Sequence, residues 1–166
     1  MIGDRWGVTD EEIARHYPCD DIVPSPSLAA WRGISVKARP EAVWPWVTQI
    51  QWAPYAYDWI DNLGKRSPQR LLGFPQPVPG DHFTSTAGRP QGRVLSIETQ
   101  VHYTGRIMGG VLSYVLVPAG DDTTRLLMKV VMSGNRWLAP VVSVGDLVMA
   151  RRQLRNLKAL AEADPA

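Results

Sequence analysis

The sequence WLAPVVSVGDLVMARRQLRNLKALA, residues 137–161, decides how the rest of the chain can fold. Its apolar side chains recur at the three- and four-residue spacing of one helical face: Val144, Leu147, Val148, Leu154, Leu157 and Ala161. A helix of about 20 to 25 residues is roughly 30 to 37 Å long, which is the width of a small domain. We therefore expect the preceding strands to curl around this helix.

The other face of the predicted helix is basic, with four cations and no acid among them: Arg151, Arg152, Arg155 and Lys158. We interpret it as a solvated face in preference to a membrane or polyanion surface. The net charge of the whole chain is +2, which is too small to indicate a nucleic-acid partner. A length of 166 residues with 45% apolar content predicts a single domain, residues 1–166, with its own core.

Compartment is suggested by the cysteine count and by the lack of long apolar runs. Cys19 is the only cysteine, so an intrachain disulfide is excluded and a reducing compartment fits. The opening MIGDRWGVTDEE is acidic and does not resemble a signal peptide. The most apolar stretch, 138–150, is too short to span a bilayer and contains Asp146. We expect a cytoplasmic protein without stable membrane insertion.

The first 28 residues are expected to form a helix and an arm outside the core, which occupies 29–166. Thr9 and Glu12 have the spacing of a capping box, which predicts a short helix over about 10–16. Three prolines then fall within 18–28, and we interpret this segment as an extended arm on the domain surface.

The order of the remaining elements indicates the fold class. Alternating polarity predicts a strand over 30–38, and Pro40 then suits the first turn of a helix. A second short helix is expected over about 55–63, before a four-proline loop, 64–80, that is either a lid or a surface wrap. Further strands are predicted at 82–86, 92–100, 101–108, 111–118 and 125–133. This is an α+β fold: a curved antiparallel sheet wrapped around a long C-terminal helix, with two short helices after the first strand.

Several motifs resemble those of a known family. In chain order they are RWG at 5–7 with TDEE at 9–12, Pro18 with Asp20-Asp21, ARP at 38–40, VWPW at 43–46 with Gln49, Tyr57-Asp58 with Asp61-Asn62, Gly80-Asp81 and TRL at 124–126. The chain thereby resembles a bacterial, largely uncharacterised branch of the START-like superfamily, also called SRPBCC, which includes polyketide cyclases, aromatases and lipid-transfer domains. The resemblance covers nearly the whole chain and implies a helix-grip fold with a deep cavity between sheet and helix. It does not imply an activity.

One departure from this family concerns the link between the two short helices. The branch usually has a glycine-rich link, whereas this chain has QWAPY at 51–55, with no glycine. The shape of the pocket mouth therefore does not follow from the resemblance.

The histidines and the single cysteine do not indicate a metal site or a nucleophilic residue. The histidines His16, His82 and His102 lack the paired spacing of metal ligands, so we expect no metal and no other cofactor. His82 and His102 both fall in predicted strands and meet only if the register allows. Cys19 has only His16 nearby in sequence, and we interpret it as a structural thiol rather than a nucleophile.

Two acids are the catalytic candidates. Asp58 and Asp61 lie among aromatic residues, where a carboxylate can act as a general acid or base. Helix capping, or a salt bridge to Arg66 or Arg70, is the structural alternative for both.

The aromatic residues are the main candidate ligand contacts. Four of the seven tryptophans fall within 44–59, and such rings either wall a pocket or fill a core. Strand parity places Lys129 in the mixed set that points to solvent. Tyr103 and Tyr114 are the tyrosines that we expect to point inward, although both faces of the strand that carries Tyr114 are apolar and parity does not decide between them. The predicted ligand contacts are Trp46, Tyr55, Tyr57, Trp59, Tyr103, Tyr114, Val144 and Val148.

Three functions remain open from the sequence. The first is a binding protein that holds a small apolar or aromatic molecule between sheet and helix. The second is an enzyme of polyketide cyclase, aromatase or dehydratase type, with Asp58 or Asp61 as acid or base and Arg106 or Lys129, if turned inward, steadying an enolate. The third is an interaction protein whose cavity is filled by its own side chains. A homodimer is also compatible with the sequence.

Overall fold

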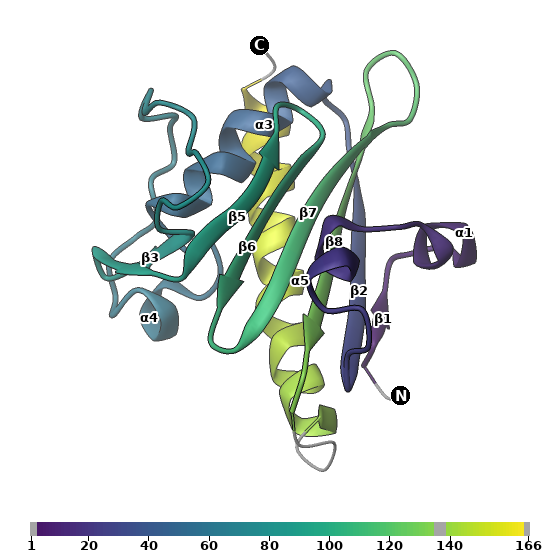
Figure 1. Cartoon of the computed structure of the whole chain (residues 1–166). Coiled ribbons are helices and arrows are strands. Elements are labelled where there is room, and N and C mark those ends of the chain that lie inside the picture. Colours follow the sequence, from purple (N-terminus) through teal and green to yellow (C-terminus); the bar gives the residue numbers. More distant parts are fainter. Residues whose placement is uncertain (1–2, 135–138, 165–166) are drawn as a thin grey trace.

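The computed structural model describes residues 3–134 and 139–164, with side chains except those of 60–61 and 139–147. Its main sheet has six strands in the order β1-β2-β8-β7-β6-β5 (Figure 1). These are β1 (Arg5–Trp6), β2 (Leu28–Val36), β5 (Arg93–Glu98), β6 (His102–Ile107), β7 (Gly110–Pro118) and β8 (Thr124–Met132). All neighbours are antiparallel except β1, which runs parallel to β2. The predicted α+β class is thus confirmed, with a mixed sheet instead of a purely antiparallel one.

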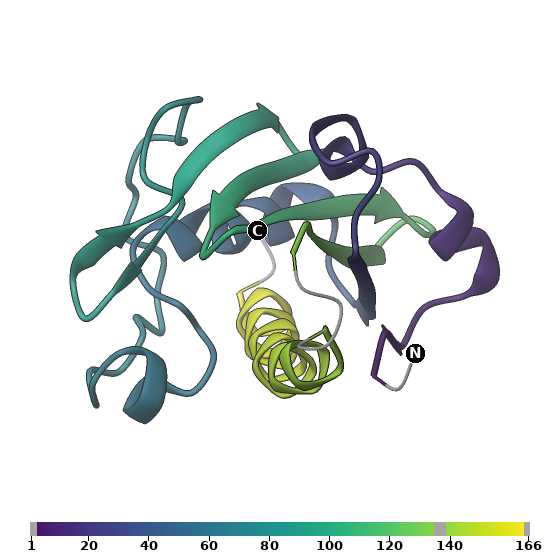
Figure 2. The same cartoon turned by 60° about the horizontal axis from the view of Figure 1, so that its bottom comes forward.

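Helix α5 (Ala139–Ala163) lies along one face of this sheet, and the sheet curves around it (Figure 2). The helix confirms the prediction made from 137–161, although Val144 and Leu147 have side chains outside the described residues. A small second sheet pairs β3 (Thr84–Thr86) with β4 (Arg89–Gln91). Strand β4 was not predicted, and the predicted strand over 82–86 begins two residues late, at Thr84.

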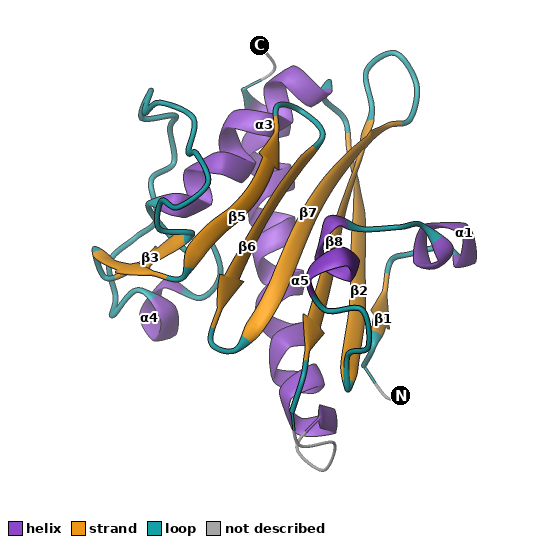
Figure 3. Cartoon of the chain, viewed as in Figure 1, coloured by secondary structure: helices purple, strands orange, loops and turns teal. Residues whose placement is uncertain are grey.

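The short helices are α1 (Asp10–Ala14), α2 (Pro18–Ile22), α3 (Pro40–Thr48), the 3-10 turn η1 (Gln49–Gln51) and α4 (Asp58–Asp61) (Figure 3). The capping box is present: the Glu12 amide donates to Thr9 Oγ1 at 3.2 Å, and the Thr9 amide donates to Glu12 Oε2 at 2.9 Å. The prediction that residues 18–28 are wholly extended was wrong. Pro18 occupies the first turn of α2, and Asp20 Oδ2 accepts the Tyr17 amide at 3.0 Å, so the segment starts a helix.

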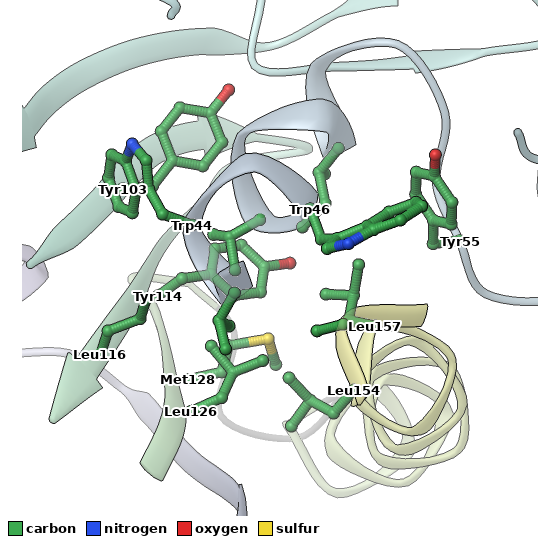
Figure 4. Packing of buried hydrophobic residues seen from close by; sticks show 14 of the residues in the cluster. Trp44, Trp46, Tyr55, Tyr103, Tyr114, Leu116, Leu126, Met128, Leu154 and Leu157 are labelled. Carbon is green, nitrogen blue, oxygen red and sulfur yellow. The ribbon is translucent and has the colours of Figure 1, made fainter. Parts of the chain in front are cut away.

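The main core lies between α5 and the inner face of the sheet, which is the face turned toward α5. Its members come from α3, the strands and α5, and Figure 4 shows how they interlock. Large members with 2% exposure or less include Trp46, Tyr55, Tyr103, Tyr114, Met128 and Leu154. Tyr103 and Tyr114 thus point inward, as expected from the sequence.

The outer face of the sheet is covered by the N-terminal segment. Tyr17 and Cys19 are fully buried there against strand residues that include Leu127 and Val131. Lys129 lies on this face, as its parity predicted, but the expectation that it reaches solvent was wrong. It is 7% exposed and forms an ion pair with Asp20, because α2 covers it.

Over the described residues, no helix combines the length and the apolar character needed to cross a bilayer.

Candidate ligand-binding site

A pocket of about 200 Å³ opens where α5 passes the β6–β7 hairpin and the β3 strand. Its wall is mainly apolar, with side chains that include Ile50, Phe83, Ile107, Leu112, Met128 and Met149. Typical small-molecule pockets measure about 300 to 1,000 Å³. The pocket therefore suits a small molecule, or one end of a longer one.

Two of the four polar side chains in this wall, Tyr114 and Gln153, are hydrogen-bonded to each other. The Tyr114 hydroxyl donates to Gln153 Oε1 at 2.6 Å, and Gln153 Nε2 donates to the Pro54 carbonyl at 2.6 Å. These bonds connect β7, α5 and the link after η1 at the pocket. Both side chains are neutral, and the wall around them is mainly apolar. The pair can therefore orient a ligand without adding a charge.

Three methionines give the pocket an adaptable lining. Met108 lies at the tip of the β6–β7 hairpin and is 88% exposed, whereas Met128 is buried in the core. Met149 reaches the pocket from α5. Unbranched, polarizable methionine side chains can repack around ligands of different shape.

Aromatic rings fill the space behind the pocket. The Phe83 and Tyr103 ring centroids are 4.8 Å apart, and the Tyr103 hydroxyl donates to the Phe83 carbonyl at 2.8 Å. This packing requires Gly105, because a Cβ there would lie 2.1 Å from Phe83 Cδ2. Burial raises the pKa of Tyr103, so this hydroxyl stays protonated. Neither Phe83 nor Gly105 was a candidate from the sequence, because only β6 packed against the β3 segment brings them together.

Tyr55 occupies the link in which the resembling family carries glycine. Its φ of +53° is in the left-handed region that favours glycine, and this bend explains why the helix predicted over 55–63 is confined to α4. Gln49 Nε2 donates to its hydroxyl at 2.6 Å, and its ring meets Trp46 edge-on at 6.3 Å. Burial raises the pKa of Tyr55 to about 12. Burial and the hydrogen bond together compensate the backbone strain of the link.

The candidates from the second short helix gather at a separate open groove of about 800 Å³ beside α5. Tyr57, Asp58 and Trp59 line it together with Arg152, whose guanidinium carbon lies 5.8 Å from the Tyr57 ring centroid. Asp58 accepts from Ser67, at 2.8 Å from its amide and 2.6 Å from its hydroxyl. The carboxylate therefore fixes the start of the 64–80 loop.

The remaining predicted contacts do not gather at the pocket. Trp46 and Tyr103 are buried in the core, and Val148 is 49% exposed on α5. The side chains of Asp61 and Val144 lie outside the described residues. Of the predicted contacts that the structure describes, only Tyr114 lines the pocket itself.

The histidines have separate surroundings. His82, which is not in a strand, meets the Trp52 ring edge-on at 5.1 Å, and His102 Nε2 lies 3.2 Å from Ser96 Oγ. In the part of the chain that the structure describes, no group of three or more His, Cys, Asp or Glu could hold a metal ion. Burial raises the pKa of Cys19 to about 11, which keeps the thiol protonated and unreactive.

Solved structures share this fold, although no family model and no curated protein sequence matches the chain. A protein from Rhodobacter sphaeroides is 19% identical with a TM-score of 0.57, over 85% of this chain and 97% of that one. Protein MLL2253 from Mesorhizobium loti is 15% identical with a TM-score of 0.56, over 83% and 99%. The KanY protein is 16% identical with a TM-score of 0.52, over 81% and 97%. At these identities the likeness shows the fold alone.

Proposed function

We propose that this protein binds a small apolar or aromatic molecule in the pocket between α5, the β6–β7 hairpin and β3. The observation that carries the proposal is the composition of the wall, which is apolar apart from a few neutral polar groups such as Tyr114 and Gln153. This is the usual chemistry of a small-molecule site. The START-like resemblance, which places a ligand between sheet and long helix, supports the same reading and suggests membership in that superfamily.

The lining favours binding over acid–base catalysis. Among the described side chains of the wall, Tyr114 is the only titratable one. Asp58, the catalytic candidate that the structure describes, lines the other groove and accepts two hydrogen bonds from Ser67. In this position the Asp58 carboxylate holds the loop through Ser67 and does not face a molecule in the pocket.

We also propose, as expected from the sequence, that the protein is cytoplasmic. The sole cysteine, Cys19, is buried as a free thiol, which suits a reducing environment.

Two neighbouring positions on α5 test the binding site. Met149 lines the pocket, whereas Val148 beside it is 49% exposed and is not part of the lining. We expect the emission of the apolar fluorophore 1-aminoanthracene to rise on addition of the protein. Met149→Trp should weaken this binding by about tenfold or more, because the indole occupies the pocket, a loss of about 1.4 kcal/mol. Val148→Trp should bind like the wild type.

The same titration tests whether the catalytic candidate Asp58 contributes to binding in the pocket. Asp58→Asn should leave the affinity for 1-aminoanthracene unchanged, because its carboxylate lies outside the pocket wall. Equal affinities of the Met149→Trp and Val148→Trp proteins would place the fluorophore elsewhere and refute this site.

A further inference from the structure

The exposed apolar side chains are concentrated in one region of the surface. Among the described residues, seven of the ten large exposed apolar side chains fall within 52–78. We define the loop surface as six of them: Trp52, Leu63, Leu71, Leu72, Phe74 and Val78, with exposed fractions from 36% to 76%. The 64–80 loop and α4, which carries the exposed Trp59, lie on the same side of the molecule in Figures 1 and 2. Large exposed apolar patches mark interaction surfaces.

The loop surface is held in place by hydrogen bonds from the core. The buried Gln49 side chain donates to the Arg70 carbonyl at 3.0 Å and accepts the Leu72 amide at 2.8 Å. Trp44 Nε1 donates to Gln76 Oε1 at 2.9 Å. The loop is therefore anchored to the core, and its apolar side chains are exposed even though its backbone is held in place.

Two aromatic rings support each other within this surface. Trp52 and Phe74 have centroids 4.4 Å apart and planes inclined by 33°, above a small hollow of about 120 Å³ that Leu71 also lines. The outer parts of both rings stay in water, with 40% and 50% exposure.

The loop that carries most of this surface is basic. Residues 62–80 contain Lys65, Arg66 and Arg70 and no acid. None of the three forms an ion pair with a described residue, and all three are exposed. Asp58, Asp61 and Asp81 flank this stretch. Asp58 and Asp81 accept backbone amides, from Ser67 at 2.8 Å and Val78 at 3.0 Å, and the side chain of Asp61 lies outside the described residues. A partner of this segment must accept apolar side chains and bring negative charge.

We propose that the loop surface adsorbs to an anionic lipid bilayer. Leucine, phenylalanine and tryptophan side chains enter the boundary between headgroups and acyl chains, while lysine and arginine meet the phosphate groups. The described loop forms no strand, so it offers no edge to a partner protein's strand, and its hollow is too small for a partner helix. The proposal stands on this surface and does not depend on the ligand pocket.

Vesicle flotation tests the charge requirement. The wild-type protein should float with vesicles of equimolar phosphatidylcholine and phosphatidylglycerol and should bind phosphatidylcholine vesicles much less. Each basic residue near the surface contributes about fivefold in affinity, so Arg66→Gln with Arg70→Gln should weaken binding by about 25-fold. The matched control is Arg151→Gln with Arg155→Gln, which removes two charges that stack on Trp6 and should keep the wild-type affinity.

A fluorophore at the loop tests which part enters the lipid. Cys19 is buried, so a nitrobenzoxadiazole label can be attached selectively at Phe74→Cys, or at the exposed Ala119→Cys in the β7–β8 turn as control. Anionic vesicles should shift the emission of the label at position 74 to the blue and leave the label at 119 unchanged.

Three results would overturn the proposal: no binding to vesicles of either composition, equal shifts at both labels, or a larger loss from the Arg151 and Arg155 variant than from the Arg66 and Arg70 variant. The first would also turn attention to a protein partner for this surface. Because the Met149→Trp protein keeps the loop surface intact, it should still float, which separates this test from that of the pocket.

Discussion

The two faces of the six-stranded sheet are buried by different means. The inner face meets α5 through large rings and aliphatic chains, with Trp46 1% exposed and Leu154 fully buried. The outer face is covered by the N-terminal segment, and ion pairs stand among its apolar contacts: Lys129 with Asp20, and Arg125 with Glu12. The inner face is thus stabilised by the packing of large apolar side chains, and the outer face also by electrostatic pairs.

The largest expected effect is on the inner face. Trp46→Ala should lower the free energy of unfolding by about 4 kcal/mol, because it leaves a cavity between α3 and α5 (Figure 4). Urea unfolding at neutral and at acidic pH measures it, and the loss should be the same at both. A loss below about 1 kcal/mol would contradict a core organised around this ring.

The second prediction concerns the buried ion pair of the outer face. Asp20→Ala should cost about 2 kcal/mol, and Lys129→Met should cost less, because Lys129 is the more buried partner, with 9% side-chain exposure against 24% for Asp20. The Lys129 Nζ also lies 5.0 Å from the Trp31 ring centroid, so the unpaired ammonium would remain among apolar groups.

The double variant Asp20→Leu with Lys129→Met is the control for this pair. It should recover most of the loss of Asp20→Ala, since an apolar pair needs no compensating charge. If the two single variants lose equal free energy of unfolding and the double variant recovers none of it, the outer face is stabilised by apolar packing alone.

The smallest effect concerns the other ion pair. The hydrogen bond from Arg125 lowers the pKa of Glu12 below its ordinary value of 4.5. A depressed folded-state pKa gives stability that is present above the unfolded-state value and is lost as the pH falls through the folded-state value. Glu12→Gln should therefore cost about 1 kcal/mol at neutral pH and almost nothing at about pH 2.

Urea unfolding of both proteins across this range isolates the contribution of Glu12. The lowered pKa of Glu162, which pairs with Lys158, acts equally in the wild type and the variant and cancels in the difference. A difference that does not change with pH would contradict an electrostatic attachment of the N-terminal segment.

Local periodicity predicted most of the fold. The helical spacing of 137–161 and the alternation in the strands depend only on which residues face one core, so α5 and the strands from β5 to β8 followed from sequence. The outer face could not be predicted in this way. Lys129 has the pattern of a solvent-facing residue, and only the docking of α2 buries it.

The candidate site was predicted in part. Tyr114 was expected to point inward and does line the pocket. Phe83, Gln153 and Met149 were missed, because Phe83 precedes β3 while the other two lie on α5, far along the chain, and none of them carries a motif. The bend at Tyr55 was also missed, since a tyrosine with positive φ has no sequence signal and depends on the hydrogen bond from Gln49.

Methionine methyl groups test the central claim, ligand binding in the pocket, most directly. Met108, Met128 and Met149 line the pocket, whereas Met132 packs beside Leu28 and Ala30 away from it. With ¹³C-methyl methionine, addition of 1-aminoanthracene should shift the signals of the first three and leave that of Met132 in place. Bound fluorophore with unchanged signals from Met128 and Met149, or with an equal shift at Met132, would contradict the proposed site.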